Sequence, residues 1–269
     1  MEAMAIIWFL SAWEFPDKRI SMAGYSVFAE FYDELTINAE YSRRAEYFLV
    51  LLKRLGHKPV LALDLACGTG SLTLELYRKG IDIYGVDASV EMLSRAREKC
   101  IDAGADILFL QQKMQDLDLY GTVDTVFCSL DSINHLQGKE EVQKAFQKVA
   151  LFLEPRGYFV FDLNTLYKHE KILGSNTYIY DMERIYCVWQ NRFISSTGRV
   201  DISLDFFHRE GDLYHRSRER FSEFAYPIQY ITHWLQMAGF DKIHLFDELS
   251  FEPPRKDSQR VVVAARKGC

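Results

Sequence analysis

The sequence lacks several features that would assign it to particular classes of protein. No apolar run approaches the roughly 18–20 residues that a membrane-spanning helix requires. The five cysteines are scattered and form no C-x-x-C pair, which argues against a zinc site or a disulfide framework and predicts a cytoplasmic protein. The net charge of −6 argues against a broad nucleic-acid surface, although it leaves room for a local basic patch.

The first 21 residues differ in character from the remainder of the chain. Their apolar stretch, Ala5–Leu10, is short and is preceded by Glu2 rather than by basic residues, so we do not expect a signal peptide. We interpret residues 1–21 as an N-terminal extension that is poorly ordered or results from an over-long start assignment.

From residue 22 onward the chain alternates between short apolar runs and amphipathic segments. Strands are predicted in the first half of 60–70 and at 81–86, 107–111, 123–130 and 158–163. Helices are predicted at 25–35, 41–55, 71–79, 90–100, 140–153 and 227–239. Strands separated by helices argue for parallel crossovers. The last two predicted strands, 241–246 and 259–266, have no helix between them, which predicts an antiparallel edge.

Between 167 and 226 the pattern changes to aromatic residues in period-two alternation. Three long strands are predicted at 183–195, 199–209 and 212–224, and we interpret them as an antiparallel sheet inserted after the fifth strand. A row predicted to be exposed on it could select a substrate, or could serve sheet packing or a dimer face. That row consists of Trp189, Asn191, Tyr214, Arg216 and Arg218.

A glycine turn follows the first strand, within Val60–Gly70 (VLALDLACGTG). Gly68 and Gly70 allow a ligand to approach the backbone, and the helix after them presents free N–H groups. The third glycine of a dinucleotide fingerprint would fall at Thr73, and the carboxylate of Asp64 would repel a pyrophosphate. The turn therefore suits a ligand that carries an ammonium group and hydroxyls.

Asp87 closes the second predicted strand, 19 residues after Gly68. An acidic residue at this distance can accept hydrogen bonds from both hydroxyls of a ribose, and the alternative is a solvated turn aspartate. Ser89 is predicted to cap the following helix.

The motifs D-x-A-C-G-T-G at 64–70 and V-D-A-S-x-x-M-L at 86–93 resemble the class I S-adenosylmethionine-dependent methyltransferases. Within them the chain is most similar to the glycine/sarcosine N-methyltransferase-like group and related bacterial small-molecule methyltransferases. The resemblance covers roughly 24–267 and is sharpest over 60–164. It implies an α/β fold with a Rossmann-like, doubly wound, seven-stranded, mostly parallel sheet whose last strand is reversed. Residues 22–165 and 226–269 would form the methyltransferase domain, and 166–225 the inserted antiparallel subdomain on the substrate side.

The resemblance also implies S-adenosyl-L-methionine as the cofactor. Tyr32 and Arg43 match residues that touch its methionine moiety in the family, or else they are a core tyrosine and a solvated charge. Met92 and Met114 would pack on the adenine, although Met92 is equally a core residue. The residues expected to bind the cofactor are Tyr32, Arg43, Asp64, Ala66, Gly68, Gly70, Asp87, Ala88, Met92, Met114, Gln115 and Leu130.

One position departs from the family pattern. The acidic or amide residue that takes the adenine amino group falls on Lys113, which has only donors. This leaves the contact to Gln112, Gln115, Asp116 or the backbone.

The loop after the fourth strand, 131–136 (DSINHL), should face both cofactor and substrate. It resembles the S-x-x-H-type loop of the glycine N-methyltransferase group, and neither the N/D-P-P-Y/F motif nor the Pro-Cys motif of other methyltransferases. Histidine is the side chain suited to proton transfer near neutral pH, so His135 could take a proton from an attacking amine or hydroxyl. The alternative is a histidine that caps or satisfies the following helix.

We therefore predict methyl transfer to a nitrogen or oxygen of a small molecule, with no metal, no membrane partner and a possible homodimer. A base is optional, because in-line placement can itself supply several kcal/mol. Three alternatives stay open. A nucleotide-dependent oxidoreductase is disfavoured by Thr73 and Asp64, and an RNA-modifying methyltransferase is disfavoured by charge and by the loop after the fourth strand. A non-catalytic cofactor-binding partner subunit is suggested by Lys113 and by the lack of a definite base.

Overall fold

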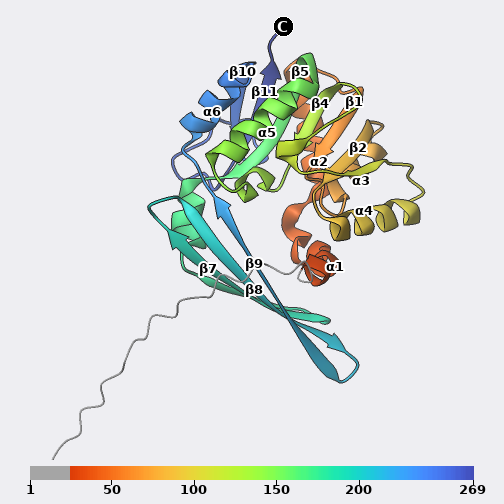
Figure 1. Ribbon diagram of the computed structural model, residues 1–269, viewed down its shortest axis with the longest axis vertical. Coiled ribbons are helices and arrows are strands. Elements are labelled where there is room, and N and C mark those ends of the chain that lie inside the picture. The colour runs from red at the N-terminus through yellow and green to blue at the C-terminus, as the bar shows by residue number, and fades with distance from the viewer. Residues whose placement is uncertain (1–24) are drawn as a thin grey trace, which may run out of the picture.

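The computed structural model describes residues 25–269, which form two separate β-sheets (Figure 1). The predicted extension, 1–21, lies outside the described residues. The large sheet has the order β10-β11-β5-β4-β1-β2-β3. Its strands are β1 (Leu61–Leu65), β2 (Asp82–Asp87), β3 (Phe109–Gln111), β4 (Val123–Cys128), β5 (Leu153–Asn164), β10 (Phe240–Asp247) and β11 (Arg260–Lys267).

The strands of the large sheet run parallel except one. β1 pairs in parallel with β2 and β4, and the pairs β2–β3 and β4–β5 are also parallel. β11 is antiparallel to both β5 and β10. The predicted mostly parallel, seven-stranded sheet with a reversed last strand is therefore confirmed.

Helices cover both faces of this sheet. They are α2 (Tyr41–Arg54), α3 (Ser71–Arg78), α4 (Val90–Asp102), α5 (Lys139–Phe152) and α6 (Ile228–Met237). Leu63 on β1 packs in one core cluster with α5 and α6, whereas its neighbour Ala62 packs in a second cluster with α2 and α3. Burial on both faces explains why these strands have nearly continuous apolar sequences.

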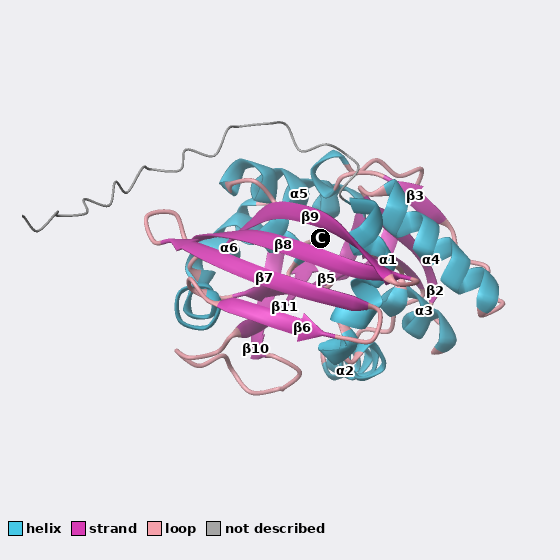
Figure 2. Ribbon diagram, turned by 90° about the horizontal axis from the view of Figure 1, so that it is seen from below, coloured by secondary structure: helices cyan, strands magenta, loops and turns pink. Residues whose placement is uncertain are grey.

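The small sheet is antiparallel and consists of β6 (Thr177–Asp181), β7 (Ile185–Ile194), β8 (Arg199–Glu210) and β9 (Leu213–Phe224). It has four strands rather than the three predicted. β6 was not predicted because it is short and has no buried residue that would mark an inner face. α1 (Tyr25–Leu35) packs Phe28 and Phe31 against one face, beside Phe206. Figure 2 looks onto the opposite face, and no helix lies in front of it.

The predicted exposed row on this sheet is wrong. The strand register places Trp189 opposite Leu204 and Glu219, on the face that packs against α1. Arg218 lies opposite Asp205, one residue further along β8, and therefore on the other face together with Tyr214 and Arg216. Trp189 and Asn191 thus share a face with each other and not with the arginines.

Within residues 25–269, none of the helices has the length and apolar character needed to cross a membrane.

Candidate active site

The glycine turn lies between the end of β1 and the start of α3. Ala66, Gly68 and Gly70 all have positive φ angles, of 58°, 54° and 72°. A Cβ atom on Gly68 would meet nothing within 4 Å, so this glycine borders open space that a ligand can enter. A Cβ on Gly70 would lie 2.9 Å from the Cβ of Ala96, so Gly70 permits the close packing of α4.

Asp87 joins the turn to the end of β2. Its Oδ2 accepts from the N–H of Gly68 at 2.8 Å, and its Oδ1 accepts from the N–H of Ser89 at 2.8 Å. Burial raises the pKa of Asp87, and these two hydrogen bonds lower it by a smaller amount. Each carboxylate oxygen keeps a second lone pair for a ligand hydroxyl. An open space beside Gly68 and a carboxylate with free lone pairs fit the ribose of the expected cofactor.

Asp64 is buried at 2 % exposure and accepts from the hydroxyl of Thr73 at 2.6 Å. Burial raises its pKa to about 7, against the smaller effect of the Thr73 hydrogen bond. Thr73, at the position of the missing third glycine, therefore fastens α3 to β1.

α1 covers the turn. The carboxylate of Asp33 accepts from Thr69 at 2.7 Å and from Ser71 at 3.0 Å, and it forms an ion pair with Lys99 at 2.6 Å.

Tyr32, the neighbouring residue, has a pKa raised well above its usual value by burial and by the nearby Tyr41, Asp131 and Asp87. Its phenol therefore lies within electrostatic range of both the Asp87 carboxylate and the loop after β4. This position brings Tyr32 together with the other predicted cofactor residues.

Arg43 is placed differently. Its side chain is 62 % exposed and pairs with Glu40 at 2.7 Å. The next residue, Arg44, is buried and reaches Asp162 at 2.9 Å. The structure therefore places the side chain of Arg44, rather than that of Arg43, on the buried face of α2.

The expected adenine side contains Met92 and Met114, both buried. The N–H of Met92 donates to Ser89 at 3.1 Å, which confirms the predicted cap of α4, and the carbonyl of Ala88 accepts from Gln111 at 3.3 Å. Met114 belongs to the main core cluster.

Two of the four candidates for the adenine amino group are otherwise engaged. The side chain of Gln112 makes two hydrogen bonds to the backbone of Asp118, each of 2.8 Å. Asp116 pairs with Lys144 at 2.7 Å on the surface. Gln115, which is partly buried, and the backbone are left.

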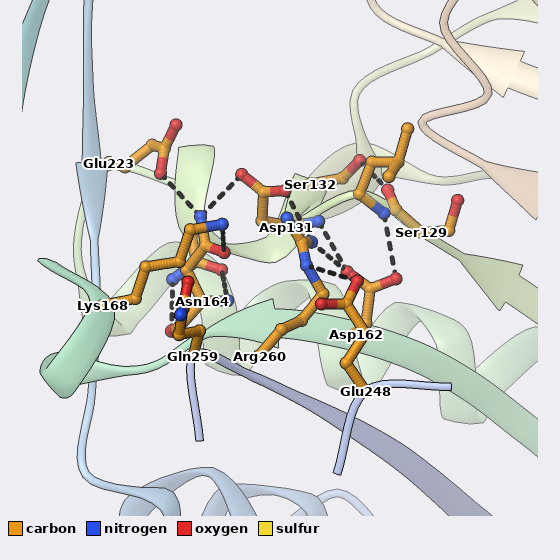
Figure 3. Close-up of polar contacts among 12 residues, drawn as sticks. Ser129, Asp131, Ser132, Asp162, Asn164, Lys168, Glu223, Glu248, Gln259 and Arg260 are labelled. Atoms are coloured by element: carbon orange, nitrogen blue, oxygen red, sulfur yellow. Dashed lines mark hydrogen bonds and ion pairs between the residues drawn. The ribbon is translucent and has the colours of Figure 1, made fainter. Parts of the chain in front are cut away.

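The loop after β4 is clamped by a buried aspartate that the sequence did not single out. Leu130 and Asp131 both have positive φ angles, of 55° and 53°. Their N–H groups donate to the two oxygens of Asp162 on β5, at 3.1 and 2.8 Å. Asp162 is fully buried and also binds Arg44. Its contact with Arg260 can be followed in Figure 3.

Asp131 points into this site. Its carboxylate pairs with Arg260 at 2.6 Å and accepts from the amide of Asn164 at 2.9 Å. Burial by itself would raise the pKa of Asp131, but Arg260, Lys168 and His135 outweigh it and hold this pKa below its usual value. Asp131 therefore carries a negative charge.

His135 lies in a short 3-10 helix, η3 (Ser132–His135), in the loop after β4. Its side chain is 45 % exposed, and its Nε2 is 3.8 Å from Oε1 of Glu223, whose side chain is buried on β9. Its ring lies 5.3 Å from the ring of Phe221. Polar atoms of Asp131, His135 and Glu223 all lie within 4.8 Å of one another. Glu223 was missed in the sequence because it lies in the inserted sheet, and only the fold brings it to the loop after β4.

Comparison with known proteins also indicates a methyltransferase. A family model described as "Methyltransferase domain" matches residues 62–157. YqeM of Bacillus subtilis, named as a methyltransferase, is 32 % identical over 244 residues, covering 90 % of this chain and 97 % of that protein. Glycine/sarcosine N-methyltransferase of Parasynechococcus marenigrum is 27 % identical over 234 residues, covering 81 % of this chain and 76 % of that enzyme.

Among solved structures, an S-adenosylmethionine-dependent methyltransferase from Clostridium acetobutylicum superimposes with a TM-score of 0.82. It is 31 % identical in sequence, and the match covers 91 % of this chain and 99 % of that one. With the glycine turn, the buried Asp87 carboxylate and the reversed strand in place, the chain belongs to the S-adenosylmethionine-dependent methyltransferases.

Proposed function

We propose that the chain transfers the methyl group of S-adenosyl-L-methionine to a nitrogen or oxygen of a small-molecule acceptor. The observation that carries this proposal is the convergence of Asp131, His135 and Glu223 beyond the end of β4. His135 also lies within electrostatic range of Asp87, on the side where the cofactor ribose is expected. An acceptor bound among these three residues would therefore lie beside the cofactor pocket.

Similar proteins support the class of acceptor. Glycine/sarcosine N-methyltransferase acts on small amines, as its name states. An N,N-dimethyltransferase for a dTDP-linked amino sugar from Streptomyces fradiae is 31 % identical over 123 residues, 46 % of this chain. Both use small acceptors rather than nucleic acids, which agrees with the net charge of −6.

The bound cofactor supplies a methyl group activated by its sulfonium. Asp87 would hold the ribose hydroxyls, Gly68 would leave room beside them, and Tyr32 would cover the pocket from α1. The acceptor's lone pair forms the bond to the methyl carbon as the carbon–sulfur bond breaks, and that bond's electron pair stays on sulfur. Placement of the two reactants in line can supply several kcal/mol of the barrier. His135 would take the proton that the acceptor loses.

The test is a metabolite-library screen with labelled cofactor, with release of S-adenosylhomocysteine as the readout. We expect turnover with one chemical class of amine or hydroxyl compound, and much less in Asp87→Ala. RNA and a mixture of cellular proteins are included as separate samples. Methylation of RNA alone, or of nothing until a second chain is added, would overturn the proposal.

A further inference from the structure

A buried histidine behind the acceptor site faces a buried carboxylate. His169 lies in η4 (Lys168–Leu173), is fully buried, and places its Nδ1 2.9 Å from the carbonyl oxygen of Gly198. A carbonyl oxygen only accepts hydrogen bonds, so Nδ1 must carry the hydrogen. The other ring nitrogen, Nε2, is 3.4 Å from Oε2 of Glu223 and has no hydrogen-bond partner anywhere in 25–269.

This geometry requires a proton between the two side chains. A neutral His169 protonated on Nδ1 would point a bare lone pair at an ionised carboxylate, so that two acceptors would face each other without water. A buried polar atom without a partner is costly, and so is a buried charge that is not paired. A second proton on Nε2 removes both costs, because the imidazolium then donates to the Glu223 carboxylate.

One other cationic side chain acts on Glu223. Lys168 donates to Asn164 at 2.9 Å, its charge is shared among Asp131, Glu223 and Glu248, and burial lowers its pKa. Asn164 donates to Oε2 of Glu223 at 3.2 Å without contributing a charge. His169 and His135, at 3.4 and 3.8 Å from the Glu223 oxygens, form the ion pairs closest to this carboxylate, and Lys168 is shared with two other carboxylates.

We infer that His135, Glu223 and His169 form a proton relay on the acceptor side of the site, in which His135 alone carries the proton and Glu223 and His169 hold His135 in place. His169 is the imidazolium, Glu223 is ionised, and His135 is neutral with its Nε2–H directed at Oε1 of Glu223. Nδ1 of His135 is then the free base. The inference rests on the proposed function for its chemistry, but the protonation state of His169 stands on the geometry alone.

The relay moves one proton from the acceptor to water. As the acceptor nitrogen or oxygen bonds to the methyl carbon, its hydrogen leaves as a proton and binds to Nδ1 of His135. The resulting imidazolium is stabilised by Glu223 across the 3.8 Å that separates Nε2 from Oε1, a distance that can shorten when substrate binds. Because His135 is 45 % exposed, it then returns the proton to water. Glu223 and His169 are positioning residues, since they fix the tautomer and orientation of the base.

The same residues, Asp131, His135 and Glu223, also have the spacing of a metal site. We favour the relay because Arg260 and Asn164 already bind the Asp131 carboxylate and Lys168 adds a nearby positive charge. The positive charges repel a divalent cation, and the existing bonds occupy the Asp131 oxygens that would bind it. A metal site is kept as the alternative outcome of the test.

The direct test is nitrogen-15 NMR of the imidazole rings in the complete protein, which needs no acceptor. The chain has seven histidines, so the signal of His169 can be assigned by substitution. We expect both ring nitrogens of His169 to be protonated at pH 7.5 in the wild type. In Glu223→Gln this imidazolium signal should be lost. Glu219→Gln is the matched control, because Glu219 is also buried on the same face of β9, and it should leave the signal unchanged. A neutral His169 in the wild type would overturn the inference, whatever the screen shows.

A second test uses an acceptor found in the screen. Glu223→Gln should lower kcat by about 10²-fold and change its pH profile, as loss of general-base catalysis does, while the KM for the cofactor stays the same. Glu223→Asp should restore part of the activity, and His135→Ala combined with Glu223→Gln should be no slower than His135→Ala alone. Activity that is lost with EDTA and restored by Mn²⁺ would instead assign the cluster to a metal and refute the relay.

Discussion

Thr73 donates its hydroxyl hydrogen to Oδ2 of Asp64 at 2.6 Å, and this bond joins the first turn of α3 to β1. In a dinucleotide-binding turn the same position is the third glycine, which lets the helix pack closely on the strand. Here the side chain occupies that position and binds the strand. Thr73, whose presence in place of glycine argued against a diphosphate ligand, thus has a structural role of its own.

The buried carboxyl of Asp64 should make stability depend on pH. Its pKa rises from 3.8 to about 7 on folding, so between these values the folded chain binds more protons than the unfolded chain. The free energy of unfolding should therefore fall as pH rises through this window, by up to about 1.4 kcal/mol per pH unit. Asp64→Asn keeps an acceptor for Thr73 but cannot ionise. Urea unfolding at pH 5 and pH 8 should show that the variant gains stability relative to wild type at the higher pH, and a constant difference would contradict the assignment.

Asp87→Ala should weaken binding of S-adenosylmethionine at least about tenfold, because hydrogen bonds to a charged group contribute about 1.5–3 kcal/mol each. Calorimetric titration measures this loss directly. Asp82→Ala is the control, since Asp82 is exposed at the other end of β2 and should bind normally. Unchanged affinity in Asp87→Ala would remove the ribose assignment.

The two glycines of the turn should respond differently to valine. Both have positive φ, which costs a side chain about 1–2 kcal/mol. Gly68→Val places its side chain in open space, so it should block cofactor uptake with only a modest fall in Tm. Gly70→Val must also displace Ala96, so its Tm should fall further. Equal Tm values, or normal cofactor binding by Gly68→Val, would argue against the pocket as described.

Asp162→Asn should destabilise the fold by about 3–5 kcal/mol, the usual cost of removing one partner from a buried ion pair. Asp162 is fully buried and neutralises Arg44 and Arg260 while it binds the loop after β4. Chemical denaturation measures the loss. Asp241→Asn, which breaks the exposed Asp241–Arg266 pair, should change stability little. Similar effects of the two substitutions would mean that the buried network contributes less than its geometry indicates.

The parts of the fold set by local pattern could be predicted from the sequence. The strand that contains Asp64, the turn at Gly68 and the cap at Ser89 depend on residues close together in the chain, and each lies where the pattern predicts it. β6 was missed because a short strand without a buried face carries no periodic signal.

The parts of the site set by long-range contacts could not be predicted. In the sequence Asp162 is one more residue of a buried strand, and its partner Arg44 lies 118 positions away. The predicted row on the small sheet was wrong for a related reason. β7 and β9 do not pair with each other but each pairs with β8, so the sequences of β7 and β9 do not show which of their residues share a face.

α1 is bonded to the glycine turn through Asp33 and packed into the small sheet through Phe31. A rigid-body displacement of this helix would therefore uncover the cofactor pocket and the acceptor site together. Release of S-adenosylhomocysteine and release of the methylated product would then depend on the same motion of α1. A substitution such as Asp33→Asn would change the dissociation rates of both ligands in parallel.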